Sequence, residues 1–366
     1  MRRKIAALGL MLALACLGSA AAAQDSWTHR GRDATRNSYA PDGAAPAIAA
    51  PRFVATAPGY ELVGQSAPVV HGGLVFVHAV KEVPDGAGDT KWVRAVLAFR
   101  ESDGGLAWDT VIGDQLTFDS RVSATVDASR GQVLIGAGYA VTALAAADGA
   151  ILWQSPVSPS PIVNSTVCIA GDTAVVCDYT GFGYGATAYG IDLNPAAPLA
   201  AGEVAWLGDL WRSSGCEAAL SPGTPDAVIV PDSAGYLRQF ALDGTPGWEF
   251  ASPLVATSGT FQAGCTVVGG RVYAATYNYY GSQNNARLFC VDAATGAQVW
   301  NAPCERTSTT PIVAGGKVIL AGGLLRYLQA AKSAQSPPPE TSSEARRKAL
   351  DVRPETRLSV AQRPAG

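Results

Sequence analysis

The sequence predicts an all-β fold, a β-propeller of about six four-stranded blades, with seven or eight blades as the alternative. A short apolar run, a turn with Asp, Asn or Gly, and a tryptophan recur at intervals of roughly 40 to 55 residues. A second kind of hairpin, in which two apolar runs flank a Gly-rich turn, precedes each of these copies. Such β-rich alternation with glycine turns indicates propeller blades and not helical hairpins.

The chain begins with a segment that has the pattern of a secretory signal. Basic residues precede an apolar run over residues 5–17, and a series of small residues ends at Ala23. The run is shorter than the roughly 20 residues that a bilayer requires. We therefore expect residues 1–23 to be removed on export, which leaves no transmembrane segment. Lipidation of Cys16 is the alternative.

The remaining chain divides into three parts. Residues 24–50 are an N-terminal extension, residues 51–332 contain the propeller, and residues 333–366 are predicted to be a disordered tail because they are polar and rich in proline. The stretch "APRFVATAPGYEL" resembles a lone outer strand with Phe53 at the tryptophan position. We expect this N-terminal strand to complete the last blade, because a ring closed in this way leaves no exposed sheet edge.

The inner hairpins and the outer hairpins differ in number. Six stretches of the type "SAPVVHGGLVFV" predict inner hairpins, whereas the sixth, "TTPIVAGGKVIL", is followed by no tryptophan strand. The outer strands carry Trp108, Trp153, Trp206, Trp248 and Trp300.

Six cysteines follow the predicted signal, an even number that favours disulfides in an exported chain. Their spacing matches neither a zinc knuckle nor a vicinal pair. Because pairing requires neighbouring strands, the expected pairs are Cys168 with Cys177, Cys290 with Cys304, and Cys216 with Cys265.

The composition and the motifs argue against several classes of function. Charged residues make up 16% of the chain and the net charge is −3, so the basic stripe that binds nucleic acid or an anionic membrane is missing. The histidines, His29, His71 and His78, are too scattered to indicate a metal site or a catalytic triad. The run "DGAGDT" at residues 85–90 lacks the spaced ligands of a calcium loop. We therefore predict no catalytic, cofactor-binding or metal-binding residue.

Three enlarged links between second and third strands offer candidate binding loops. They contain residues 85–89, 179–184 and 277–285, and they are rich in Gly, Tyr and Asn. These residue types suit adaptable recognition with aromatic anchors, although surface loops also tolerate insertions that have no function. The candidate partner-binding residues are Tyr179, Tyr184, Tyr277, Tyr279 and Tyr280.

The paired patterns "SAPVVHGGLVFV" and "LFCVDAATGAQVW" resemble the repeats of the pyrroloquinoline quinone (PQQ)-like β-propeller family, over roughly residues 51–328. The resemblance implies that each outer-strand tryptophan packs against the neighbouring blade. It also implies two functional branches, namely quinone-dependent dehydrogenases and non-catalytic exported propellers similar to outer-membrane assembly lipoproteins. The dehydrogenases use a vicinal disulfide and calcium ligands, and this sequence has no stretch that matches either, so we expect neither PQQ nor calcium as a cofactor.

These observations predict an exported, monomeric, non-catalytic β-propeller in the periplasm or at the cell surface. Its expected role is to bind a protein partner at the cell envelope. A quinone-dependent oxidoreductase and a carbohydrate-binding propeller that uses the tyrosine loops are the alternatives, because fold alone does not determine function.

Overall fold

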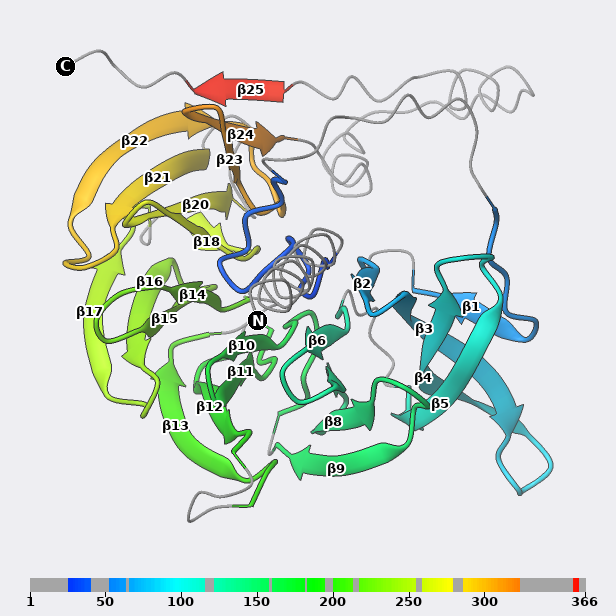
Figure 1. The fold of residues 1–366 in the computed structure, drawn as a ribbon. Helices are drawn as coiled ribbons and strands as arrows, with labels where there is room; N and C mark the ends of the chain where they lie inside the picture. Colours follow the sequence, from blue (N-terminus) through cyan, green and yellow to red (C-terminus); the bar gives the residue numbers. More distant parts are fainter. Residues whose placement is uncertain are drawn as a thin grey trace, which may run out of the picture.

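The computed structural model describes residues 26–40, 53–63, 66–115, 122–157, 160–181, 183–194, 200–212, 217–254, 259–278, 286–322 and 358–361. Within these ranges the strands form six antiparallel sheets, arranged around a central axis (Figure 1). No helix among these residues is long and apolar enough to cross a membrane. The chain is therefore an all-β propeller, as the sequence predicts.

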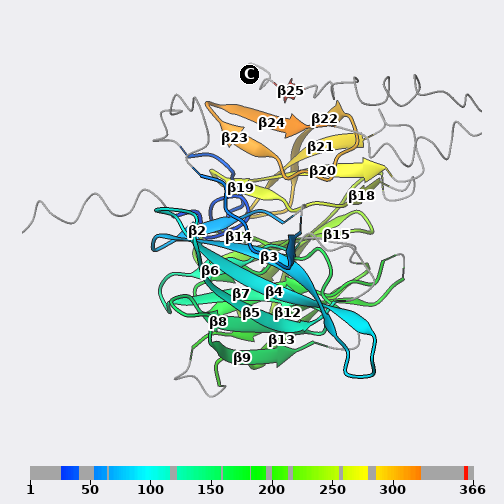
Figure 2. The ribbon, with the colours of Figure 1, turned by 90° about the vertical axis from the view of Figure 1, so that its right-hand side faces the viewer.

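The first sheet is the most extended of the six. It contains β1 (Tyr60–Leu62), β2 (Val69–His71), β3 (Leu74–Pro84), β4 (Thr90–Arg100) and β5 (Leu106–Asp114). Gly72 and Gly73 both have positive φ, 60° and 77°, in the tight turn between β2 and β3. The long β3–β4 hairpin extends beyond the neighbouring sheets (Figure 2).

Three further sheets have four strands each, ordered from the axis outward. The second contains β6 (Thr125–Asp127), β7 (Gln132–Ala137), β8 (Ala140–Ala145) and β9 (Ile151–Pro156). The third contains β10 (Cys168–Ala170), β11 (Thr173–Cys177), β12 (Ala186–Asp192) and β13 (Val204–Leu210). The fourth contains β14 (Ala219–Ser221), β15 (Ala227–Asp232), β16 (Tyr236–Ala241) and β17 (Pro246–Ala251).

The last two sheets depart from this plan. The fifth contains β18 (Gly259–Phe261), β19 (Thr266–Val268), β20 (Arg271–Asn278), β21 (Ala286–Asp292) and β22 (Gln298–Cys304). The sixth contains β23 (Ile312–Ala314), β24 (Lys317–Ala321) and β25 (Leu358–Ala361). The outer strand of the sixth sheet thus comes from the far C-terminal part of the chain.

The strand pairing corrects two expectations about closure of the ring. The N-terminal strand does not complete the last sheet, because β1 pairs with β3 of the first sheet. Pro58 lacks an N–H and Gly59 has a φ of 81°, so the chain turns before β1. β25, inside the segment predicted to be disordered, pairs with β24 and covers its edge. Phe53 nevertheless packs on Gly104, the position that a preceding outer tryptophan would take.

Apolar layers between successive sheets form the core. Trp108 packs on Gly149 in the turn of the next sheet, and its Nε1–H donates to the Ala146 carbonyl at 3.1 Å. Trp206 Nε1–H donates likewise to Leu242 O at 2.8 Å. Trp153, Trp248 and Trp300 also lie in contact with the following sheet. A side chain at the turn glycine would collide with the indole, which explains why the turn keeps a glycine.

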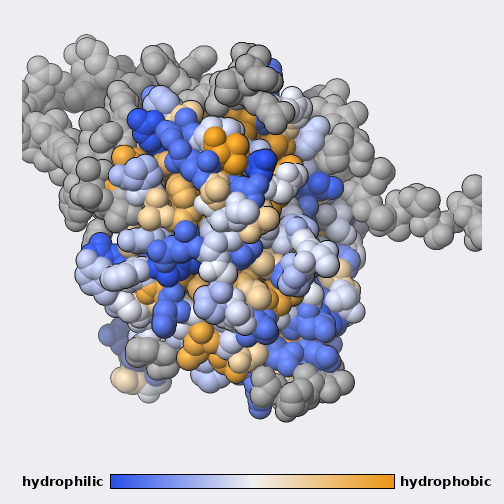
Figure 3. Space-filling view, turned by 90° about the vertical axis from the view of Figure 1, so that its left-hand side faces the viewer, coloured by the Kyte–Doolittle hydropathy of each residue, from blue (hydrophilic) through white to orange (hydrophobic). Residues whose placement is uncertain are grey.

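The outer strands form the rim of the ring. Figure 3 views the rim on the side of β17 and β22, where small hydrophobic patches alternate with hydrophilic residues. Leu207 on β13 and Val299 on β22 are among the exposed apolar side chains. Scattered residues of this kind are normal on a folded surface and indicate no binding site by themselves.

Candidate functional site

The two faces of the ring carry different kinds of connection. Within each sheet, the turn after the innermost strand and the turn before the outermost strand lie on one face, which we call the turn face. The links between second and third strands lie on the opposite face, which we call the loop face. The β3–β4 hairpin and the β11–β12 link therefore both belong to the loop face.

The predicted tyrosines take different positions. Tyr184 is 67% exposed on the loop face, and Tyr179 is half-buried beside it. Tyr277 is only 2% exposed, with the Arg306 guanidinium 5.3 Å from its ring centre. Tyr277 therefore offers no surface to a partner, because its side chain points into the sheet packing. Tyr279 and Tyr280 lie outside the described residues.

Tyr184 belongs to an exposed group of aromatic rings between the third and fourth sheets. Its ring centre lies 6.4 Å from that of Trp211, in an edge-on arrangement. Trp211 in turn stacks on Tyr236, with ring centres 6.3 Å apart and an interplanar angle of 17°. Trp211 follows β13 and is 52% exposed, while Tyr236 begins β16. We call these three residues the aromatic cluster.

Two arginines flank the aromatic cluster. The Arg212 guanidinium lies 4.1 Å from the ring centre of Tyr184, and that of Arg238 lies 5.3 Å from Tyr236. Arg238 also pairs with Glu249 at 2.7 Å. Among the residues that the structure describes, Arg212 Nε and Arg238 Nη2 are buried and have no hydrogen-bond partner. The cluster thus combines aromatic surface, two positive charges and donor groups that no described acceptor satisfies.

A buried carboxylate holds the cluster in place. Asp232 accepts hydrogen bonds from the backbone N–H groups of Trp211 at 2.7 Å and of Arg212 at 3.3 Å. Its side chain is fully buried, and burial raises its pKa, while these N–H groups and Arg238 act in the opposite direction. The backbone that carries Trp211 is therefore fixed before any ligand arrives.

Sequence reasoning did not identify Trp211, Arg212 or Tyr236. The available signal was Trp211 itself, since a second tryptophan shortly after Trp206 has no counterpart in the other repeats. A tryptophan that breaks the repeat cannot serve the packing role of the repeat.

The run "DGAGDT" at residues 85–90 contains a hydrogen-bonded turn. Asp85 Oδ1 accepts N–H bonds from Ala87 at 2.7 Å and from Asp89 at 3.0 Å. These bonds lower the pKa of Asp85. Over the described residues, no group of three or more His, Cys, Asp and Glu side chains is placed to hold a metal ion. The carboxylate of Asp85 therefore serves the turn.

The cysteine pairs are not formed among the cysteines that the structure describes. No disulfide is formed by Cys168, Cys265 or Cys304, and Cys216 lies outside the described residues. The strand register opposes Cys290 to Trp300 and Cys304 to Ala286. The predicted pair of Cys290 with Cys304 is therefore wrong, because the register places them four residues apart along the strand pair. Cys168 faces Val175 and not Cys177.

The centre of the ring is filled by the chain itself. Residues 26–40, drawn in dark blue, lie at the centre of the ring in Figure 1 and contact the innermost strands in turn. His29 lies in this segment and Ser26 contacts His71 on the first turn, whereas His78 is buried between the first two sheets. The three histidines thus form no common site.

Comparisons with known proteins identify one family that the chain matches and several solved structures that resemble it. The family described as "Outer membrane protein assembly factor BamB" matches residues 55–184 and 233–335. No curated protein matches the chain. The unmatched residues between these two segments include Trp211, Arg212 and Asp232, so the centre of the candidate site lies outside the family pattern.

Two solved structures that resemble the chain have low sequence identity to it. BamB from Moraxella catarrhalis is 16% identical, with 74% of this chain and 83% of that chain covered and a TM-score of 0.42. A quinohemoprotein alcohol dehydrogenase from Pseudomonas putida is 13% identical, with 81% of this chain and 56% of that chain covered and a TM-score of 0.53. The second likeness extends to the fold alone.

Proposed function

Because the chain belongs to the outer membrane protein assembly factor BamB family of PQQ-like β-propellers, we propose that it is an exported, non-catalytic scaffold that binds a protein partner. The partner would lie at the cell envelope, in the periplasm or at the cell surface, as the signal-like residues 1–23 suggest. The observation that carries the proposal is the aromatic cluster on the loop face.

The composition of the aromatic cluster favours a protein interface. Tryptophan, tyrosine and arginine are the residue types that most often dominate binding energy, and the cluster contains all three. Trp211 and Tyr184 expose about half or more of their surface, 52% and 67%, on a protein that buries its other blade tryptophans at least partly. Large exposed aromatic groups of this kind are typical of recognition surfaces.

The rigidity of the cluster supports the same role. Asp232 fixes the backbone of Trp211, and stacking on Tyr236 restricts the indole. A side chain that is already ordered loses little entropy on binding, so more of its contact energy appears as affinity. The guanidinium groups of Arg212 and Arg238 lie against Tyr184 and Tyr236 and would attract the carboxylates of a partner. We therefore expect a partner segment with acidic and apolar side chains.

The proposed function includes no quinone and no calcium. The axis holds residues 26–40 of the chain, and the sequence has no adjacent cysteines. The residues present at the axis thus do not suit a planar quinone. Titration with PQQ and calcium is expected to give no change in absorbance and no dye-linked oxidation of alcohols, and turnover would favour the oxidoreductase alternative.

Site-specific photocrosslinking in intact cells tests the proposal. A photoreactive phenylalanine at Tyr184 is expected to crosslink to one protein. The matched control carries the same group at Tyr139, a 53% exposed tyrosine in the β7–β8 link of the loop face. Equal labelling from both positions, or labelling from neither, would contradict the proposed site. Specific retention on an envelope polysaccharide, abolished by Trp211→Ala, would favour the carbohydrate alternative.

A further inference from the structure

The axial segment contacts every sheet of the ring. The middle residue of each innermost strand directs its N–H toward the axis, and an atom of residues 27–37 accepts it. The bonds run from Val70 to Trp27 O (2.9 Å), Val126 to Thr28 O (2.8 Å), Ile169 to His29 Nε2 (3.3 Å), Leu220 to Ala34 O (2.7 Å), Val267 to Thr35 O (3.0 Å) and Val313 to Asn37 Oδ1 (2.9 Å).

Together these six N–H groups form a binding site, because all of them donate to one segment at the centre of the ring. Each belongs to the inner edge of a sheet, where no further strand supplies an acceptor. A buried N–H without an acceptor is strongly unfavourable, so the ring of donors requires an occupant. One segment of this chain satisfies one donor in each of the six sheets, although its own backbone follows no repeat.

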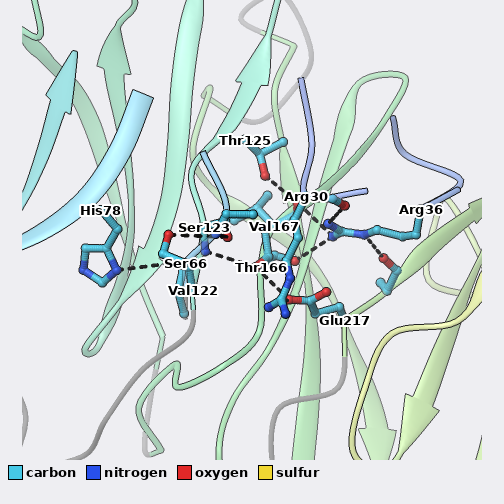
Figure 4. Close-up of polar contacts among 12 residues, drawn as sticks. Arg30, Arg36, Ser66, His78, Val122, Ser123, Thr125, Thr166, Val167 and Glu217 are labelled. Atoms are coloured by element: carbon cyan, nitrogen blue, oxygen red, sulfur yellow. Dashed lines mark hydrogen bonds and ion pairs between the residues drawn. The ribbon is translucent and has the colours of Figure 1, made fainter. Parts of the chain in front are cut away.

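Arg36 anchors the segment in the ring. Its side chain is 1% exposed, and its Nε donates to the Ala218 carbonyl at 3.0 Å. Its Nη2 donates to the carbonyls of Thr166 at 2.9 Å and Val167 at 3.2 Å (Figure 4). One guanidinium thus joins the innermost strands of the third and fourth sheets to the axial segment.

A second arginine adds an ion pair on the same side of the ring. Arg30 Nη1 lies 2.9 Å from Glu217 Oε1, and Thr166 Oγ1 donates to the same oxygen at 2.9 Å (Figure 4). Ser123 N–H in turn donates to Thr166 Oγ1 at 3.1 Å. The segment is therefore linked to a chain of polar contacts that crosses from the second sheet to the fourth.

The shape of the segment depends on its own sequence. Asp33 Oδ1 accepts bonds from the N–H and the hydroxyl of Thr35, at 2.9 and 2.6 Å. Gly31 has a φ of 87°, and a Cβ there would lie 2.9 Å from the Arg36 carbonyl oxygen. The segment is thus a compact, specific ligand and not a generic extended strand.

The two ends of the segment contact the first and the sixth sheets, and these two sheets share no strand. Trp27 and Val70 exchange two backbone bonds in the first sheet, at 2.8 and 2.9 Å. Asn37 makes two bonds to Val313 in the sixth sheet, with its Nδ2 donating at 3.0 Å and its Oδ1 accepting at 2.9 Å. β1 stays in the first sheet and β25 in the sixth, so neither strand connects them.

We propose that the ring of six inward-facing amides is a peptide-binding site whose ligand is residues 26–37 of the same chain, and that this ligand closes the propeller. The axial segment takes the place of the shared strand that other closure schemes use. This role is independent of the aromatic cluster, which lies on the loop face.

Cleavage of the full chain after folding tests the proposal. A protease site inserted between Asp42 and Gly43 allows residues 24–42 to be cut free. We expect the fragment to remain with the ring through gel filtration, and a labelled synthetic peptide of the same residues to exchange into it. Release of the unmodified fragment from a ring that stays folded would overturn the proposal.

Two arginines of the segment provide a matched pair of variants. Arg36 and Arg32 both have positive φ, 62° and 78°, so alanine imposes similar backbone strain at each position. Among the described residues, the Arg32 side chain has its polar contacts within its own segment, with Tyr39 O and Asp33. Arg36→Ala is expected to release the fragment at least tenfold faster than Arg32→Ala. Equal release rates would contradict the anchoring role of Arg36.

Hydrogen exchange gives a test that needs no cleavage. It uses no Arg36 variant, so it remains available if that variant folds poorly. Asn37→Leu removes both side-chain bonds to Val313 with little change in size. We expect exchange of the Val313 amide to accelerate at least tenfold, while the Val318 amide on β24 changes little. Unchanged protection of Val313 would show that the segment does not hold the sixth sheet.

Discussion

The axis and the loop face both depend on arginines, but they use them in different ways. Arg36 is almost fully buried and donates to four carbonyls, those of Ala218, Thr166, Val167 and Arg30. Arg212 lies against an exposed tyrosine, and its Nε has no acceptor among the residues that the structure describes. A guanidinium whose donors are satisfied by its own chain stabilises the fold, whereas one with donors left over is available to a ligand.

The largest expected effect is on the free energy of unfolding, and it distinguishes Trp206 from Trp211. Trp206→Ala should lower the free energy of unfolding by about 3 to 5 kcal/mol, because Trp206 is buried between sheets and bonded to Leu242 O. Trp211→Ala should cost less than about 1 kcal/mol, since its ring is half exposed. Urea unfolding of both variants measures the difference. Equal losses would mean that Trp211 is structural and would remove the basis of the binding site.

Substitution of Arg36 should likewise cost more stability than substitution of Arg212. Arg36→Ala leaves buried carbonyls without donors and should cost about 3 kcal/mol of stability. Arg212→Ala should cost less than about 1 kcal/mol, because it removes mainly a contact with an exposed ring. Thermal unfolding at pH 7 compares the two variants. A larger loss for Arg212→Ala would invert the comparison between axis and loop face.

Affinity for a partner should depend on the loop face and not on the axial segment. Once a partner is identified by crosslinking at Tyr184, Trp211→Ala should weaken its binding by about 2 kcal/mol, or roughly thirtyfold. Arg32→Ala is the control, because its side chain is bonded within the axial segment. Calorimetry with the purified partner measures both affinities. Loss of binding in the control alone would move the interface from the loop face to the axis.

Acid should destabilise the folded protein through two buried histidines, His29 and His78. Burial lowers the pKa of His29 to about 3 and that of His78 to about 4. The folded protein therefore keeps both neutral, while the unfolded chain binds protons below pH 6.5. Each histidine should cost about 1.4 kcal/mol of stability per pH unit as the pH falls from 6.5 towards its folded pKa. His29→Gln should make this decline less steep, which urea unfolding at a series of pH values would show.

The repeat made most of the fold predictable, because it is local. The tight turn at Gly72 and Gly73, the strands beside it and the tryptophan that packs on the next turn glycine all depend on neighbours a few residues away or one repeat away. Even the position of Phe53 against Gly104 follows from the same pattern. The sequence could therefore predict an all-β propeller and its blade tryptophans.

The candidate site was predictable only in part. Tyr184 was identified from its loop, whereas Tyr277, assigned to a similar loop, lies in strand β20 and is buried. Trp211 and Tyr236 come from different sheets and stack only after the ring has formed. Cys290 and Cys304 share a hairpin but not a register position, and register depends on the bulge between Cys290 and Val291.

What the sequence by itself determined is the repeating blade, since hydrophobic alternation, turn glycines and tryptophan spacing act over short distances. The tertiary structure alone decided how the ring closes and what lies on its axis. Residues 26–37 contain no repeat. Their acceptor atoms are given donors only when six separate strands place their N–H groups around one centre. Long-range hydrogen bonding of this kind leaves no periodic trace in a single sequence, because each partner is a different residue in a different blade.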